Sequence, residues 1–203
     1  MISNEILAFL LAVSFAAGLN VSLTIATLGL LARAGVLALP GELDMLASWW
    51  VIGGASVLVL LEFVADKIPA FDLIWNFLQT FIRVPAGALL AYAGTASLDP
   101  TWQLAAAAAG GSVALGAHSA KVALHSAVTP SPEPVSNFLV SLTGEAFAIF
   151  IIWFAAEHPY VAATIVIVLL VAIVLLVRWM VRAMVRLFRR FNTPRPDSIQ
   201  API

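Results

Sequence analysis

The chain has 203 residues, of which 62% are hydrophobic and 10% are charged, and its formal net charge is −1. An ordinary soluble domain carries about 25% charged residues and covers its surface with polar groups, so this composition argues against a soluble enzyme, a coiled coil and a disordered chain. The absence of cysteine excludes disulfides and thiolate chemistry, and the near-neutral charge gives no electrostatic case for nucleic acid. A mean hydropathy of +1.03 predicts an integral membrane protein.

A membrane-spanning helix needs about 20 apolar residues, and about six stretches of the sequence meet this requirement. We therefore predict an all-α, polytopic transmembrane bundle within one domain, residues 1–191, followed by a disordered cytoplasmic tail, residues 192–203. The stretch 71–81 is rich in aromatic and polar residues and offers an alternative, an interfacial helix that leaves 84–96 as a half-span. The predicted segments are 6–34, 44–66, 71–96, 102–128, 135–156 and 160–188.

Basic residues predict the orientation. Six of the 10 Lys and Arg residues lie between Arg178 and Arg195, which indicates a cytoplasmic C-terminus, and six spans then place the N-terminus in the cytoplasm too. We expect the last helix to continue beyond the bilayer with a basic face that contacts anionic lipid headgroups. The alternative is that these charges only mark topology. The basic face consists of Arg178, Arg182, Arg186, Arg189 and Arg190.

Two pairs of short segments predict an internal repeat. Residues 17–23 resemble residues 109–115, and residues 61–65 resemble residues 144–148. Because each repeat would contain three spans, the two repeats would enter the membrane from opposite sides, as in the inverted repeats of many secondary transporters. The alternative is a chance similarity, since small and aliphatic residues recur in every membrane protein. The predicted repeats are 6–96 and 102–188, and they place Glu62 and Glu145 at equivalent positions.

Ionisable residues inside the predicted spans mark a candidate polar core. Each costs at least about 2.5 kcal/mol at the bilayer centre, so Arg83 and Lys121 are expected to lie near the carboxylates of Glu62, Asp66 or Glu145. One interpretation is a pathway for a proton, an ion or an anionic group. The alternative is that these charges only hold helices together, or extend to the membrane surface.

Histidine and asparagine complete this set of candidates. A histidine ordinarily titrates near neutrality, which makes His118 and His125 candidates for proton transfer. Together with a carboxylate they offer metal-ligand types without a specific spacing, so no metal or cofactor is predicted. Gly18 and Asn20 lie within the first segment, where we expect either close packing of small residues against another helix or a helix broken at mid-membrane. The same two alternatives apply to residues 110–112. The candidate pathway residues are Asn20, Glu62, Asp66, Arg83, His118, Lys121 and Glu145.

Residues 62–69 read Glu-Phe-Val-Ala-Asp-Lys-Ile-Pro. With residues 18–33 and 81–88, Lys121 and residues 131–145, this string resembles the bacterial DUF4126 family over roughly residues 10–160, and it is the most specific part of the resemblance. Two departures stand out: Val21-Ser22 occupy the place of an expected Pro-Tyr, and Gly144-Glu145 that of an expected acidic pair. The resemblance implies a multi-pass protein of the bacterial inner membrane and no established activity.

These features lead to three hypotheses of function. The first is a small transporter or channel-like protein with a charged intramembrane core. The second is a non-catalytic membrane scaffold or accessory subunit of a larger complex. An intramembrane enzyme ranks last because no catalytic constellation is recognisable, so no enzymatic activity is predicted. The expected partners are membrane lipids, and the sequence leaves a homo-oligomer open.

Overall fold

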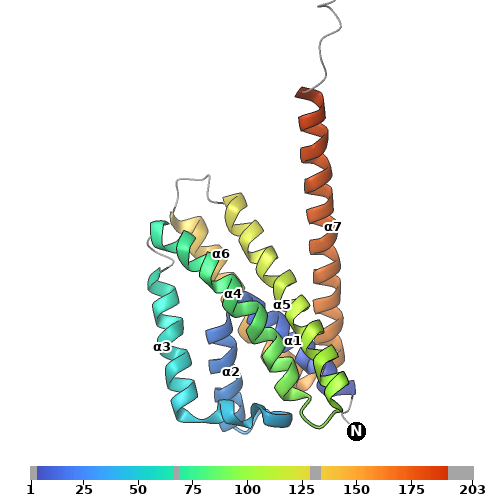
Figure 1. Cartoon of the computed structure of the whole chain (residues 1–203). Helices are drawn as coiled ribbons and strands as arrows, with labels where there is room; N and C mark the ends of the chain where they lie inside the picture. Colours follow the sequence, from blue (N-terminus) through green and yellow to red (C-terminus); the bar gives the residue numbers. More distant parts are fainter. Residues whose placement is uncertain (1–3, 66–68, 129–133, 192–203) are drawn as a thin grey trace, which may run out of the picture.

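A computed structural model describes residues 4–65, 69–128 and 134–191. This part of the chain is all-helical, with seven α-helices, one 3-10 helix and no strand, in agreement with the predicted fold class. Figure 1 shows a bundle from which the last helix projects far beyond the others. The elements in chain order are α1 (Asn4–Leu19), α2 (Val21–Arg33), η1 (Gly41–Ala47), α3 (Trp49–Ala65), α4 (Pro69–Gly94), α5 (Pro100–Val128), α6 (Pro134–Glu157) and α7 (Pro159–Phe191).

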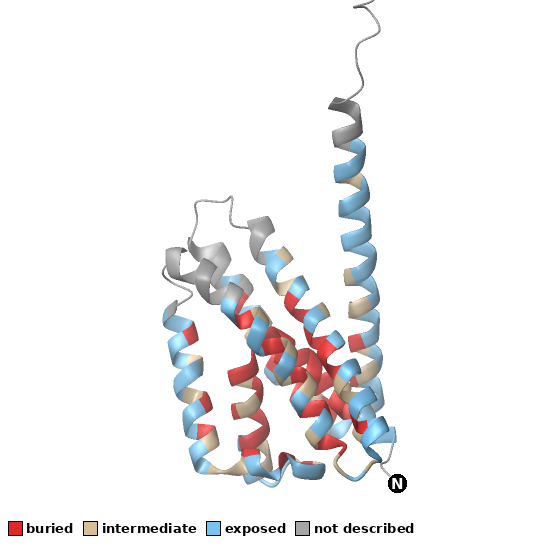
Figure 2. Ribbon diagram, viewed as in Figure 1, coloured by how far each residue is buried: buried red, intermediate tan, exposed pale blue. Residues whose placement is uncertain are grey.

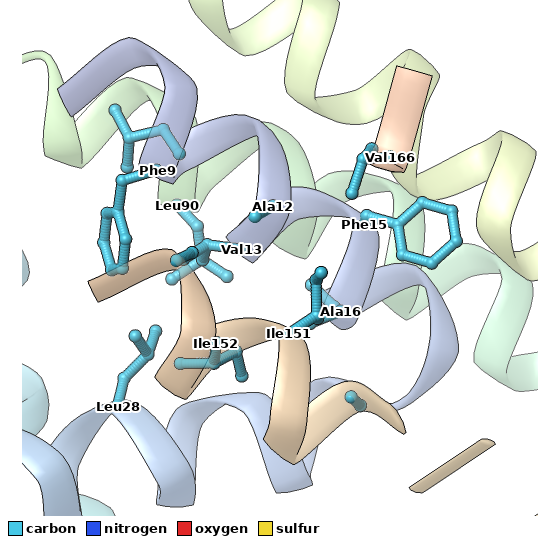
Figure 3. Packing of buried hydrophobic residues seen from close by; sticks show 14 of the residues in the cluster. Phe9, Ala12, Val13, Phe15, Ala16, Leu28, Leu90, Ile151, Ile152 and Val166 are labelled. Carbon is cyan, nitrogen blue, oxygen red and sulfur yellow. The ribbon is translucent and has the colours of Figure 1, made fainter. Parts of the chain in front are cut away.

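Helix α1 forms the centre of the bundle and contacts α4, α5, α6 and α7. Its sequence is apolar on every side, as expected of a helix that has no face towards solvent, and every residue from Ala12 to Leu19 is buried. Figure 3 shows Val13 of α1 beside Leu90 of α4 and Ile152 of α6. In Figure 2 the buried residues gather around this central helix, while α3 and α7 are exposed along most of their length.

The exposed residues of the outer helices are largely apolar. Trp50 on α3 is 91% exposed, and α7 exposes many aliphatic side chains, among them Val168, Val174 and Leu175. By length and composition, one helix can cross a membrane, Pro159–Arg186, or two if η1 and α3, which meet at 72°, form a single broken span. The prediction of six spans is not confirmed by this criterion within the described residues.

The first predicted segment, 6–34, is two helices instead of one. The chain is extended at Asn20, with φ −159° and ψ 108°, and a new helix begins at Val21. Glu5 and Phe9 near the start of α1 line the same cavity as Val36 and Leu39 beyond the end of α2. Both helices therefore return to one end of the molecule, and we call them the α1–α2 hairpin, with Asn20 as its tip (Figure 1).

Two other predicted segments each form a single unbroken helix. Helix α4 is unbroken from Pro69 to Gly94, so the stretch 71–81 is not a separate interfacial helix. Helix α5 is also unbroken through 110–112, where the alternative of close packing holds instead of a break. A Cβ atom on Gly110 would lie 2.6 Å from the Cβ of Ala91 and 2.6 Å from the carbonyl oxygen of Gly87, so α4 and α5 touch through their backbones here.

The close contact at Gly110 predicts that one added methyl group lowers the stability of the protein. Gly110→Ala is expected to destabilise the protein by about 1–3 kcal/mol, because a carbon so close to the backbone of α4 forces the helices apart. The matched control is Gly53→Ala on α3, where an added Cβ meets nothing within 4 Å, and this change should be neutral or stabilising by about 0.5–1 kcal/mol. Unfolding of both variants in detergent micelles, followed by circular dichroism, measures the difference. Equal stabilities would contradict the close contact.

The last helix is continuous at its C-terminal end, while its extension beyond a bilayer stays a prediction. Helix α7 continues to Phe191, well past Arg178, and Arg178, Arg182 and Arg186 are all exposed. The side chains of Arg189 and Arg190 and the predicted tail 192–203 lie outside the described residues.

Candidate functional site

A buried carboxylate lies beside the start of α2. Glu62 of α3 is 4% exposed, and its Oε1 atom accepts two hydrogen bonds. The hydroxyl of Ser22, in the first turn of α2, donates at 3.1 Å, and the amide Nε2 of Gln79 on α4 donates at 2.7 Å. These donors allow the carboxylate to remain charged away from water, since a buried charge is tolerated only when it is hydrogen-bonded.

Gln79 connects this carboxylate to a buried arginine. Arg83 is 2% exposed, and its Nε donates to Oε1 of Gln79 at 3.1 Å. Gln79 and Arg83 are four residues apart on α4 and therefore share one face of the helix. The amide thus bridges Glu62 and Arg83, and the cation approaches the carboxylate through an intervening polar group.

Arg83 also determines which ring nitrogen of His118 carries the proton. Nη1 of Arg83 lies 3.1 Å from Nδ1 of His118 on α5, and Nε2 of His118 lies 2.7 Å from the hydroxyl of Thr80. A guanidinium group only donates hydrogen bonds, so Nδ1 must accept and the ring proton must be on Nε2, which donates to Thr80. His118 is therefore the neutral Nε2–H tautomer in this arrangement. We call the connected side chains the polar network: Ser22, Glu62, Gln79, Thr80, Arg83 and His118.

Lys121 interacts with the other side of the hairpin tip. Its Nζ donates to the carbonyl oxygen of Leu19, the last residue of α1, at 3.2 Å. A helix carries partial negative charge at its C-terminal end and partial positive charge at its N-terminal end. The ammonium of Lys121 therefore lies at the favourable end of α1, and the carboxylate of Glu62, held by Ser22, lies at the favourable end of α2. Both new helix ends at Asn20 are thereby stabilised by opposite charges.

Asn20 itself caps the second helix. Its Oδ1 accepts a hydrogen bond from the backbone N–H of Leu23 at 2.9 Å, which is the geometry of a helix N-cap. Gly18 allows close approach to α5, because a Cβ there would lie 2.7 Å from the Cβ of Ala117. The sequence offered close packing and a broken helix as alternatives, and both occur together.

The remaining candidates are Asp66, His125 and Glu145. Asp66 lies outside the described residues, as does the side chain of His125. Glu145 is half-buried on α6, and its equivalence with Glu62 stays a prediction. Among the residues that the structure describes, no group of three or more His, Asp or Glu is arranged to hold a metal ion.

The sequence analysis missed three members of the polar network, namely Ser22, Gln79 and Thr80. Gln79 is the most important, because without it the carboxylate and the guanidinium would not be connected. The available signal was its spacing of four from Arg83, which places the two polar side chains on the same face of α4. Neutral polar residues are common in helices, so this signal is weak when it is taken alone.

Comparison with known proteins gives one clear result. No curated protein and no solved structure matches the chain. A family model described as a domain of unknown function (DUF4126) matches residues 7–179. This match covers the α1–α2 hairpin, the polar network and most of α7, and it confirms the resemblance drawn from the motif at residues 62–69. The chain belongs to the DUF4126 family.

Proposed function

We propose that this protein is a small membrane transporter or channel-like protein in which the α1–α2 hairpin enters the membrane and turns back at Asn20. The observation that carries the proposal is the helix break itself, buried beside the charges of Glu62 and Lys121. Non-helical backbone at membrane depth is tolerated only where protein or a water-filled cavity surrounds it. In many transporters such broken helices form the substrate and ion sites.

The lengths of the two helices support a hairpin that ends within the membrane. At 1.5 Å per residue, the 16 residues of α1 extend about 24 Å and the 13 residues of α2 about 20 Å, both less than the roughly 30 Å of the hydrocarbon core. Helices α3 to α7 then provide five crossings in place of six spans. The acidic residues near the open end of the hairpin would face the outside: Glu5, Glu42, Asp44, Asp99 and Glu157.

The basic end of α7 supports this orientation in the inner membrane. Helix α7, whose C-terminal part carries Arg178, Arg182 and Arg186, ends at the opposite end of the molecule from the start of α1 (Figure 1), and basic residues mark the cytoplasmic side. On this helix they would meet the anionic headgroups of the cytoplasmic leaflet, where each contributes about 1 kcal/mol to lipid binding.

The chemistry of the polar network favours a solute site over a proton wire. A proton relay requires groups that gain and lose protons, and an arginine in a protein does not lose its proton. Arg83 stands in the middle of the chain of hydrogen bonds between Glu62 and His118. The network thus acts as a set of fixed charges and dipoles around the hairpin tip.

One observation favours the alternative of a non-catalytic scaffold. Every side chain of the polar network is already hydrogen-bonded within the protein, as expected if its role is only to join α2, α3, α4 and α5. A scaffold would tolerate changes in these residues as long as the fold is retained, whereas a transporter would not.

Solute flux separates the two functions. We expect proteoliposomes containing the protein to pass at least one member of a panel of inorganic ions and small organic acids. Glu62→Gln should change that flux by roughly tenfold or more, because the substitution keeps the shape and the acceptor oxygen and removes only the charge. The control is Ser112→Ala on the exposed side of α5, which should leave the flux unchanged. Absence of flux for the whole panel, or equal flux in Glu62→Gln, would reject the transport function.

A further inference from the structure

An apolar cavity of about 500 Å³ lies between α2, α3 and α6. Leu30 and Leu60 on its walls are 49% and 65% exposed, so the cavity opens to the outside of the bundle. Apart from two hydroxyl side chains, its lining residues are all aliphatic. We call this cavity the lateral groove; it follows α2 from Leu23 to Leu31 and α3 from Ser56 to Leu60. In a membrane such an opening faces lipid chains, which match its walls in polarity.

The depth of the lateral groove matches one leaflet of a bilayer. Its inner end is at Leu23, next to the hairpin tip, and α2 ends beyond its other end at Arg33. At 1.5 Å per residue, Leu23 lies about 15 Å from Arg33 along the helix, which is half of the roughly 30 Å of the hydrocarbon core. An acyl chain that lies in the groove would therefore have its headgroup at the level of Arg33.

Arg33 is held beside the open end of the groove. It lies one turn after Leu30 on α2, and its Nη1 donates to the carbonyl oxygen of Ala47 at 2.8 Å. Its Cζ atom lies 4.4 Å from the centre of the ring of Trp49, a cation–π contact. Trp49 is two turns before Ser56 and so lies on the face of α3 that lines the groove. The guanidinium group thus stands between the ends of the two helices that form the groove.

The guanidinium of Arg33 has donors left for a phosphate. Within the described residues, no carboxylate forms an ion pair with it, and the carbonyl oxygen of Ala47 accepts from only one of its nitrogens. A guanidinium carries five N–H donors in a planar fork, which matches two oxygens of a phosphate group. Arg33 is exposed, so a headgroup can reach this fork from outside the protein.

The side chains around Arg33 are typical of the headgroup region of a membrane. Trp49 and Trp50 are both exposed, and tryptophan is enriched at the boundary between hydrocarbon and water. Glu42 and Asp44 are also exposed, in η1, which joins α2 to α3 at the end of the molecule where α1 begins (Figure 1). One cation beside two carboxylates is complementary to a headgroup that carries both a phosphate and an ammonium, and less so to a headgroup with net negative charge.

We propose that the lateral groove binds a zwitterionic phospholipid of the outer leaflet, of the phosphatidylethanolamine type. One acyl chain occupies the groove between α2, α3 and α6, the phosphate accepts hydrogen bonds from Arg33, and the ammonium is attracted by the carboxylates of η1. This inference rests on the membrane orientation in the proposed function, which places the open end of the hairpin outside, and does not require transport of a solute.

Native mass spectrometry of the purified full-length protein, released from detergent micelles, tests the proposal without measuring transport. One molecule of palmitoyl-oleoyl phosphatidylethanolamine should be retained per chain. Palmitoyl-oleoyl glycerol has the same chains without the phosphate, and glycerophosphoethanolamine has the headgroup without the chains. Each should bind about tenfold more weakly or worse, because each lacks one half of the contacts. Equal retention of the phospholipid and the diacylglycerol, or retention of neither, would overturn the proposal.

Two substitutions with matched controls locate the site. Arg33→Gln removes the charged fork from an exposed helix end and should weaken binding of the phospholipid about tenfold or more, whereas Arg182→Gln on α7 should not. Ser56→Phe fills the groove and should weaken binding by a similar factor, whereas Val57→Phe, at the next and exposed position of α3, should not. The arginine pair decides the outcome even if Ser56→Phe does not fold. Equal affinity of Arg33→Gln and Arg182→Gln would show that the lipid covers the surface without a specific site, and would reject the proposal.

The lipid site and the transport function fail separately. Retention of the phospholipid that depends on Arg33, in a protein that passes no solute, would keep the lipid site and reject the transporter. Flux that changes in Glu62→Gln, in a protein that retains no phospholipid, would keep the transporter and reject the lipid site. Retention of a second copy of the chain in place of lipid, lost in Ser56→Phe, would make the groove a protein interface and would also reject the lipid site.

Discussion

Arg83→Met is expected to lower the free energy of unfolding by about 3–5 kcal/mol. The guanidinium group of Arg83 is buried and hydrogen-bonded both to Gln79 and to His118. Its removal leaves the charge of Glu62 without its bridged partner and leaves Nδ1 of His118 without a donor. Removing one member of a buried charge network costs far more than the network contributes as a whole, because the other charge remains in a medium that cannot solvate it.

Denaturant unfolding in micelles, followed by circular dichroism, measures this effect. The matched control is Arg182→Met on the exposed face of α7, which should change the stability by no more than about 0.5 kcal/mol. In the double variant with Glu62→Gln, part of the loss should be recovered, because both charges are then absent; a coupling of about 1–3 kcal/mol is expected. A loss below about 1 kcal/mol in Arg83→Met would mean that the network does not stabilise the fold.

The charged part of this network is predictable from the sequence. Glu62, Arg83 and His118 lie in three different predicted segments, yet the cost of a lone charge in an apolar environment requires such groups to meet. The bridging role of Gln79 does not follow from that argument. A neutral amide carries no comparable penalty, so only the packing of α3 against α4 shows that it lies between the two charges.

The hairpin is the feature that composition could not determine. An apolar run of 29 residues from 6 to 34 is equally consistent with a tilted span and with two helices that turn back at Asn20. The difference depends on long-range packing. Helix α1 is enclosed by α4, α5, α6 and α7. The residues of α1 that fill this central position are of the same apolar types as those of an ordinary membrane helix, so their composition does not reveal the position.

The comparison of Asn20 with Ser112 explains why only one of two similar segments breaks. Asn20 offers an acceptor to the N–H of Leu23 and so starts a new helix. Ser112, in the segment 109–115 that resembles 17–23, donates its hydroxyl to the carbonyl oxygen of Ala108 within the same helix, which leaves the helix intact. The resemblance between these segments therefore does not extend to their backbone structure, and the predicted repeat stays a prediction.

The α1–α2 hairpin also predicts that the two ends of the chain lie on opposite sides of the membrane. Figure 1 shows α1 beginning at the end of the molecule where α2, α4 and α6 finish, and α7 finishing at the other end. If the arginines of α7 lie in the cytoplasm, as we propose, the start of α1 would lie outside. Six full spans would instead place both ends in the cytoplasm, so the two arrangements differ in the location of Glu5.

The absence of cysteine from the chain makes this prediction simple to measure. Single cysteines at Glu5, Glu42 and Arg186, which are all exposed, provide one thiol each for a maleimide that does not cross membranes. In intact spheroplasts, Glu5→Cys and Glu42→Cys should react nearly completely, and Arg186→Cys should react only after the membrane is opened. Reaction of Glu42→Cys without Glu5→Cys would show that the first segment crosses the membrane after all. In that case the polar network could not lie beneath a hairpin tip, because α1 and α2 would have to run as one continuous span past Asn20.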